Sequence, residues 1–206
     1  NPVNNQLKII TKIEVKIIFD NLDKNKYKLS KEKYYSPEFE HLFKSCINYI
    51  PTYNNEDIIT TYPVKYIIIS DPLFQSVLQP LIEWKIKKGF NVIEGYTDDP
   101  AVGNTTVSIY NFIKSFYDNS TANDPPPTYL LIVGDINLVP SFSGNTGNHV
   151  SDMYYCEFDG NGDFYPEMYY GRFSGENISQ IEAQVSKTLM YEKYTFPNPD
   201  FLDDVL

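Results

Sequence analysis

Two short apolar runs constrain the fold of this chain more strongly than any other feature. Lys65–Ser70 (KYIIIS) and Tyr129–Val133 (YLLIV) are apolar without alternating polar positions. This pattern is typical of strands covered on both faces in a parallel sheet. Phe90–Tyr96 lies between them and predicts a further strand. Because parallel neighbours need crossover connections, the pattern predicts an α/β fold.

The segments between these strands have the periodicity of amphipathic helices. Asp71-Pro72 supplies an acidic cap and a first-turn proline, and Gly89 follows the expected helix end. Thr105–Tyr117 predicts a second helix, and 177–194 predicts a final one before Pro197. We therefore expect an open, mostly parallel sheet with flanking helices. Near its end, 154–158 and 167–170 predict a β-hairpin on either side of a polar loop.

The first part of the chain has a different pattern. Lys8–Phe19 alternates apolar and charged residues, which predicts a half-buried strand. Glu38–Ile47 has the spacing of a short helix, and a polar connector ends at Pro63. We expect residues 1–62 to form a small β-rich segment and residues 63–206 to form the α/β unit.

Composition excludes some classes of function. The formal net charge of −10 disfavours binding to a nucleic-acid backbone. No run of 18 apolar residues is present, so the sequence predicts no membrane span. Two cysteines are too few for a disulfide scaffold. The chain begins at Asn1-Pro2 without an initiator methionine or signal peptide, and we expect it to be a processed or excerpted piece of a longer precursor.

An oxygen-rich loop is the strongest sign of a binding site. The run 159–167 (DGNGDFYPE) contains three carboxylates, one amide and two glycines. Ca²⁺ takes six to eight oxygen ligands, and glycines let the backbone turn so that the oxygens converge. The alternative is an ordinary turn, since Asp, Asn and Gly are the commonest turn residues. Asp135 ends a predicted strand, at the edge where open α/β sheets bind ligands.

The order of several short motifs resembles the gingipain family of secreted cysteine peptidases. The motifs are Tyr129-Leu-Leu-Ile-Val-Gly-Asp135, Pro140, Ser151-Asp152, the acidic loop, Gly171-Arg172-Phe173-Ser174, and Tyr191-Glu192 in the last helix. Upstream, Ile67–Ser70 and Trp84–Gly89 (WKIKKG) resemble the opening strand and helix of the family. The resemblance covers about residues 64–192.

The resemblance implies the first subdomain of a caspase-like catalytic domain, preceded in residues 1–62 by the end of a pro-region. The whole protein would be a secreted or cell-surface cysteine endopeptidase made as a zymogen, acting on proteins or peptides. The catalytic Cys and His would come from a second subdomain, downstream of Leu206, which would be the partner of this segment. The segment alone would be inactive. A non-catalytic gingipain-like module for binding or secretion is the alternative.

The resemblance also implies a calcium site. Its ligands would be the carboxylates of Asp135, Asp163 and Glu167 together with the backbone carbonyls of Tyr165 and a residue near Gly160. The loop has one residue more than the family pattern, so Asp159, Gly160 and Asn161 are alternatives for the last oxygen.

Two further features allow a structural and a functional interpretation. His149 and Cys156 could form a nucleophile pair of an unrelated enzyme, but Cys156 lies in an apolar pattern typical of a buried, inert thiol. Arg172 could pair with a carboxylate across a subdomain junction, or it could form a surface ion pair.

Overall fold

A computed structural model describes residues 12, 14, 42, 45, 63–121, 123–144, 149–160 and 164–198. The described part contains a four-stranded sheet in the order β2-β1-β3-β6, and all neighbours are parallel. The strands are β1 (Lys65–Ser70), β2 (Asn91–Tyr96), β3 (Tyr129–Val133) and β6 (Tyr169–Phe173). β1 and β3 begin and end where their apolar runs predict.

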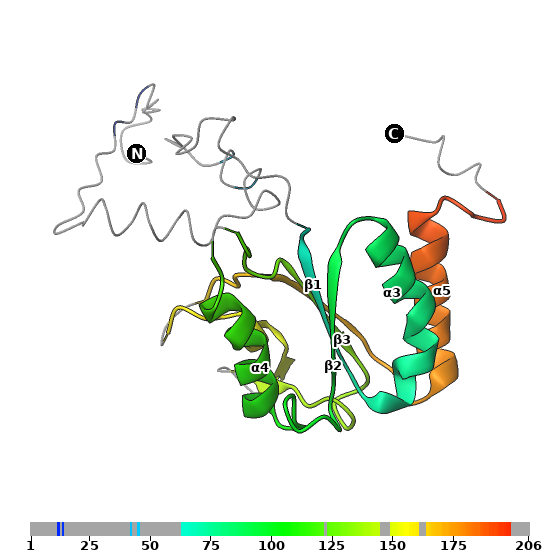
Figure 1. Cartoon of the computed structure of the whole chain (residues 1–206), viewed down its shortest axis with the longest axis horizontal. Coiled ribbons are helices and arrows are strands. Elements are labelled where there is room, and N and C mark those ends of the chain that lie inside the picture. The colour runs from blue at the N-terminus through cyan, green and yellow to red at the C-terminus, as the bar shows by residue number, and fades with distance from the viewer. Residues whose placement is uncertain are drawn as a thin grey trace, which may run out of the picture.

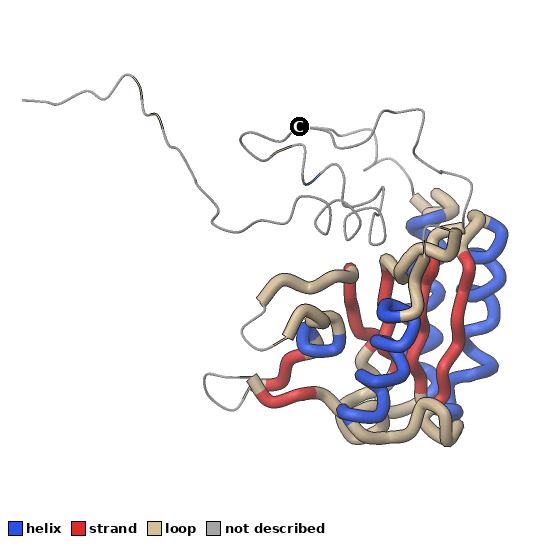
Figure 2. Tube along the Cα trace, turned by 60° about the vertical axis from the view of Figure 1, so that its left-hand side comes forward, coloured by secondary structure: helices blue, strands red, loops and turns tan. Residues whose placement is uncertain are grey.

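Three helices cover the two faces of this sheet. α3 (Gln75–Lys87) and α5 (Ile178–Glu192) pack together on one face, and α4 (Thr106–Asp118) lies on the other (Figure 1). The 60° rotated view shows the same three layers (Figure 2). The predicted α/β class with a mostly parallel sheet is therefore confirmed.

The alternation of side chains along the strands divides the core between the two faces. Ile67 and Ile69 of β1 point toward α4, whereas Ile68 points toward α3 and α5. All three are at most 1% exposed. Because the positions of this strand are buried or half-buried on one face or the other, a continuous apolar run is required here instead of an alternating one.

The helices begin at the capping residues that the sequence supplies. The Asp71 carboxylate accepts a hydrogen bond from the backbone N–H of Leu73 at 2.9 Å, which starts the short 3-10 helix η1 (Pro72–Phe74) before α3. Thr105 and Ser108 form a reciprocal capping box at α4, and Asn177 caps α5. Capping satisfies backbone donors that have no partner within the helix.

The predicted hairpin around the acidic loop is wrong. The first arm contains the 3-10 helix η2 (Met153–Tyr155), and the second arm is replaced by β6, which begins at Tyr169 and pairs in parallel with β3. A separate antiparallel pair joins β4 (Phe142–Ser143) to β5 (Val150–Ser151). The strand expected at 8–19 and the helix expected at 38–47 fall outside the described residues, apart from isolated positions.

Candidate metal loop and the carboxyl edge of the sheet

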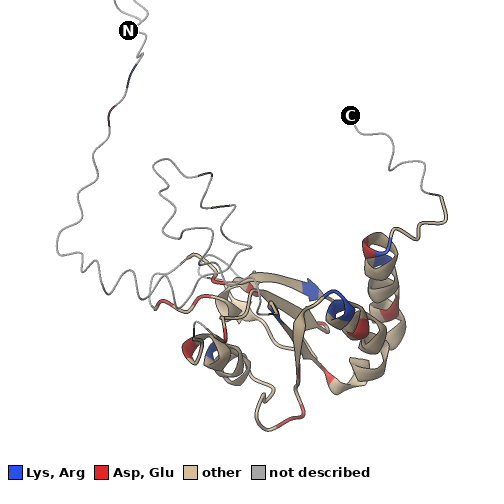
Figure 3. Cartoon of the chain, turned by 45° about the horizontal axis from the view of Figure 1, so that its top comes forward, with Lys and Arg blue, Asp and Glu red and all other residues tan. Residues whose placement is uncertain are grey.

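The topology brings several polar groups to the carboxyl edge of the sheet. The chain leaves β1 for one face and approaches β3 from the other, so these two central strands form a topological switch point. The N–H of Asp71, after β1, donates to the carbonyl of Val133 at 3.3 Å. Asp135 follows β3 at the same edge. Carboxylates elsewhere are spread over helices and loops (Figure 3).

Asp135 is held by both its backbone and its side chain. Its N–H donates to the Gly175 carbonyl at 2.9 Å, and its own carbonyl accepts from Leu138 and Val139, both at 2.9 Å. Its Oδ1 accepts from the Ser174 hydroxyl at 3.0 Å. The preceding Gly134 has φ +126, which L side chains rarely adopt, so the sharp turn requires glycine. Asp135 is therefore fixed at the strand end, as predicted.

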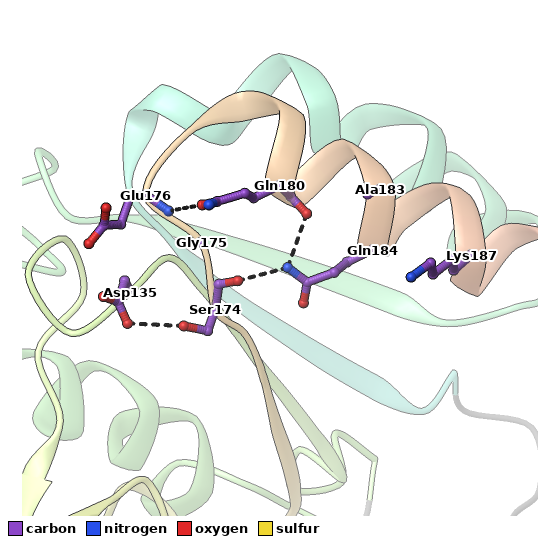
Figure 4. Close-up of a pocket in the computed structure, with 8 residues that line it drawn as sticks. All are labelled: Asp135, Ser174, Gly175, Glu176, Gln180, Ala183, Gln184 and Lys187. Carbon is purple, nitrogen blue, oxygen red and sulfur yellow. Dashed lines mark hydrogen bonds between the residues drawn. The ribbon is translucent and has the colours of Figure 1, made fainter.

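A cavity of about 510 Å³ opens beside Asp135. It lies between the residues that follow β6 and the start of α5, and we call it the α5 groove (Figure 4). Its lining includes Asp135, Ser174, Glu176, Gln180, Gln184 and Lys187. Gln184 Nε2 donates to the Ser174 carbonyl at 2.8 Å, which joins the two walls.

Arg172 is the centre of the densest polar network in the described part of the chain. Its Nε donates to Asp152 Oδ2 and its Nη2 to Oδ1, both at 2.7 Å, in a bidentate pair. Its Nη1 also donates to the carbonyls of Gly134 at 2.8 Å and Val139 at 2.9 Å. Ser141 completes the network by donating to Asp152 at 2.8 Å. Arg172 therefore ties β6 to the loop after β3.

This network differs from both sequence interpretations of Arg172. The partner lies within the same sheet unit, and the two side chains are only 12% and 16% exposed. Neither a junction contact nor an ordinary surface pair describes it. Ser151-Asp152 is one of the sequence motifs, but no local pattern indicates that Asp152 is the partner of Arg172.

Two hydrogen bonds join the two ends of the acidic loop. The Glu167 N–H donates to the Cys156 carbonyl at 2.8 Å. Glu167 Oε2 accepts from the Phe158 N–H, also at 2.8 Å. Gly160 has φ +105, and Tyr165 is 82% exposed. Asp163 lies outside the described residues.

The structure does not bring Asp135 and Glu167 together. Asp135 contacts Ser174, just after the carboxyl end of β6, whereas Glu167 precedes the amino end of that strand. At about 3.3 Å per residue, the four steps from Tyr169 to Phe173 span roughly 13 Å. Two oxygens bound to one Ca²⁺ lie at most about 5 Å apart, given ligand distances near 2.5 Å. In this arrangement Asp135 is separate from the rest of the predicted ligand set.

The other predicted ligands remain a prediction. Gly160, Tyr165 and Glu167 belong to one loop, and their oxygens are of the type that Ca²⁺ prefers. Within the ranges that the structure describes, no group of three or more His, Cys, Asp and Glu is arranged to hold a metal ion. Asp163, the middle carboxylate of the loop, lies outside these ranges.

Cys156 does not have the environment of a nucleophile. Its side chain is fully buried in the core under α4, and burial raises the pKa of the thiol. Nearby Glu167 acts in the same direction. A catalytic cysteine needs the opposite, a partly exposed thiol with a lowered pKa. His149 is exposed and lies directly before β5. The hypothesis of a His149–Cys156 pair is therefore contradicted.

A doubly wound parallel sheet with a polar carboxyl edge is the architecture of the caspase-like α/β domains. Residues 59–205 match the sequence model of Peptidase family C25. The chain is 34% identical over 204 residues to Lys-gingipain W83 from Porphyromonas gingivalis, which covers 99% of this chain and 12% of that protein. This chain belongs to the gingipain family of cysteine peptidases, peptidase family C25.

Solved structures agree with this assignment. A structure titled "Structure of Protease" has a TM-score of 0.62 at 35% identity, covering 71% of this chain and 30% of that one. The Arg specific cysteine proteinase gingipain R has a TM-score of 0.55 at 27% identity, covering 63% and 28%. A complex of Porphyromonas gingivalis RgpB pro- and mature domains has a TM-score of 0.54 at 28% identity, covering 62% and 29%. The chain thus spans under a third of each.

Proposed function

We propose that this chain is the amino-terminal part of a secreted or cell-surface gingipain-like cysteine endopeptidase, made as a zymogen. The observation that carries the proposal is the family match over residues 59–205 together with its caspase-like fold. In this role the α/β unit supports a second subdomain, which supplies the Cys–His pair for attack on a peptide bond. Residues 1–62 correspond to the end of the pro-region.

The burial of Cys156 supports a nucleophile outside the described residues. Acyl transfer requires a thiol that is ionised and that reaches a substrate carbonyl, and a fully buried thiol with a raised pKa meets neither requirement.

Among the helices that the structure describes, none has the length and apolar character of a membrane span.

The test is hydrolysis by the longest natural precursor that contains this sequence. We expect it to cleave a protein substrate such as casein after maturation, and we expect iodoacetamide to abolish the cleavage. The variant Cys156→Ala should keep the activity, because this thiol is buried away from substrate. A precursor that matures but cleaves nothing would favour the alternative of a non-catalytic module.

We propose in addition that the acidic loop holds one Ca²⁺. Asp163 and Glu167 would provide carboxylates, and Tyr165 and Gly160 would provide backbone carbonyls. All are hard oxygen donors, which suits Ca²⁺ rather than Zn²⁺. The ion would stabilise the folded loop and carry no step of the chemistry. Glu167 supports the proposal because the Phe158 N–H already orients its carboxylate at 2.8 Å.

Calcium binding is tested by the unfolding temperature of this chain in Ca²⁺ and in EGTA. At a hundredfold excess over Kd, ligand binding adds about 2.7 kcal/mol to stability. Asp163→Asn and Glu167→Gln should remove the shift. The matched control is Asp135→Asn, which neutralises one carboxylate at the far end of β6 and should keep the shift. If Asp135→Asn removes it as well, Asp135 belongs to the ligand set. If the parent shows no shift, the calcium proposal fails.

A further inference from the structure

The α5 groove lies at the end of the sheet where open α/β folds bind their ligands. Asp135 follows β3 and Ser174 follows β6, so both residues stand at the carboxyl ends of parallel strands. The volume of about 510 Å³ falls within the range of roughly 300–1,000 Å³ that is typical of sites for small ligands. The proposed calcium loop does not use this groove, so its polar lining has no assigned role.

One wall of the groove is a polar stripe along α5. Gln180, Gln184 and Lys187 are four and three residues apart, so they lie on one side of the helix. A different side of the helix packs against α3. Positions that face only solvent have no second wall, whereas this stripe faces Asp135 and Ser174 (Figure 4). The stripe therefore forms part of an enclosed surface.

Hydrogen bonds hold both walls in place and leave other polar atoms available. Gln180 Oε1 accepts from the Glu176 N–H at 2.7 Å, and Gln184 Nε2 donates to the Ser174 carbonyl at 2.8 Å. The Ser174 hydroxyl donates to Asp135 Oδ1. Among the residues that the structure describes, no hydrogen bond uses Gln180 Nε2 or Gln184 Oε1. The groove therefore offers one amide donor and one amide acceptor, which are the partners that a peptide backbone needs.

The groove is acidic at one end and basic at the other. Asp135 and Glu176 lie near the start of α5, and Lys187 lies further along the helix with its ammonium directed back along the groove (Figure 4). Within the described part of the chain, none of these three side chains forms an ion pair. Glu176 and Lys187 are eleven positions apart. At about 1.5 Å per helical residue, this separation is roughly 16 Å.

We propose that the α5 groove binds a short extended peptide that has a free amino group and a free carboxylate. The ammonium of the peptide contacts Asp135 and Glu176, and its carboxylate contacts Lys187. The peptide backbone between them pairs with Gln180 and Gln184. An extended chain spans about 3.3–3.6 Å per residue, so roughly four or five residues fit between the two charged ends.

The choice of a peptide rests on the proposed peptidase function. Hydrolysis of a peptide bond adds one water molecule and releases one new amino group and one new carboxylate. Short products of this reaction therefore carry the two charges that the groove complements. A single amino acid carries the same charges, but they are too close together to reach both ends of the groove.

The experiment is an NMR titration of this chain with the pentapeptide GSGSG. Two exposed ion pairs give weak binding, so we expect a Kd of about a millimolar. The amide signals of Gly175, Gln180 and Gln184 should shift and saturate, and the amides of β1 are the internal reference. Absence of saturable shifts at about ten times that concentration overturns the proposal.

Modified peptides test the two charges without any change to the protein. N-acetylation removes the ammonium, C-amidation removes the carboxylate, and each change should weaken binding by about threefold or more. The dipeptide GS should bind at least about threefold more weakly than GSGSG, because it cannot reach both charged ends. Equal affinity for all four peptides would overturn the proposal.

Protein variants then assign each charge to its contact. Lys187→Ala should bind the free and the amidated pentapeptide equally, and the double variant Asp135→Asn, Glu176→Gln should bind the free and the acetylated pentapeptide equally. Glu182→Gln and Lys87→Ala, which lie outside the groove, are the matched controls and should behave like the parent. If amidation weakens binding to Lys187→Ala as much as to the parent, Lys187 does not hold the carboxylate and the proposal fails.

The peptidase role is measured separately, by hydrolysis of casein by the longer precursor. An inactive precursor together with saturable pentapeptide binding would refute the peptidase role and leave the groove proposal standing. An active precursor with no pentapeptide binding to this chain would refute the groove proposal alone.

Discussion

Arg172 and Asp152 form a bidentate ion pair, with both nitrogen–oxygen distances at 2.7 Å, that fastens an edge strand to the loop after β3. The same guanidinium donates to two carbonyls of that loop, Gly134 and Val139. A planar group with five donors suits this combination, which a lysine ammonium cannot reproduce. Both side chains are largely buried, so removing one leaves the other uncompensated.

We therefore expect Arg172→Ala to destabilise the chain by about 3 kcal/mol, as measured by urea unfolding. Arg172→Lys should recover only a small part of this loss, because the bidentate geometry is gone. Lys88→Ala is the control. Lys88 is 41% exposed in its ion pair with Glu192, and its removal should cost less than about 1 kcal/mol. Equal losses for the two alanine variants would contradict the structural role of Arg172.

Glu192 predicts a dependence of stability on pH. Burial alone would raise its pKa, but hydrogen bonds from Lys85, Lys88 and Trp84 outweigh burial and lower the pKa from its ordinary value of 4.5. A carboxyl group whose pKa is lowered by folding stabilises the fold above its unfolded pKa. That contribution is lost as the pH falls through the folded pKa.

Glu192→Gln should therefore reduce stability at neutral pH and flatten the stability curve below pH 4.5. Chemical unfolding at several pH values measures both effects. Glu182→Gln, an exposed carboxylate on the same helix, is the control and should keep the parent curve. A Glu192→Gln curve parallel to that of the parent in acid would show that the three donors do not act on this carboxylate.

Cys156 should react with thiol reagents only when the fold opens. In a Cys46→Ser background, where Cys156 is the sole cysteine, we expect labelling by an aromatic disulfide to be slower in the native chain than in urea by a factor of at least about a thousand. The measurement is absorbance after mixing at neutral pH. Rapid native labelling would place the thiol at the surface and reopen its role as a nucleophile.

Asp71 should contribute to stability as a helix cap. Asp71→Ala removes the carboxylate that accepts the Leu73 N–H at 2.9 Å and should cost about 1 kcal/mol in thermal unfolding. Asp71→Asn keeps an oxygen acceptor and should cost less. If both substitutions cost the same, the charge of Asp71 matters more than its hydrogen bond.

The parts of the fold predicted from sequence are those fixed by local patterns. β1 and β3 are largely apolar runs, α4 and α5 carry their own caps and periodicity, and α3 follows the capped turn η1, so each element needs little information from the rest of the chain. β6 was mispredicted as part of a hairpin. Its sequence (YYGRF) is short, contains Gly171 and has no continuous apolar run. Its partner β3 lies some forty residues earlier, and local pattern does not specify such a pairing.

The candidate site could also be predicted only in part from local sequence patterns. The fixed position of Asp135 at a strand end followed from the pattern of β3. The separation of Asp135 from Glu167 could not be predicted, because it depends on the parallel direction of β6. The Arg172–Asp152 pair also depends on tertiary structure, since the two residues are twenty positions apart and the whole acidic loop lies between them.

The contact between Trp84, Lys85 and Glu192 has a consequence for synthesis on the ribosome. Glu192 accepts from Trp84 at 2.9 Å and from Lys85 at 2.6 Å, across a separation of more than a hundred residues. A nascent chain that ends before Ile178 therefore presents α3 without its cover, with Leu78 and Leu81 missing the contacts of Ile181 and Val185. Translation must pass α5 and clear the exit tunnel before this layer closes, so chaperone contacts during elongation should concentrate on α3.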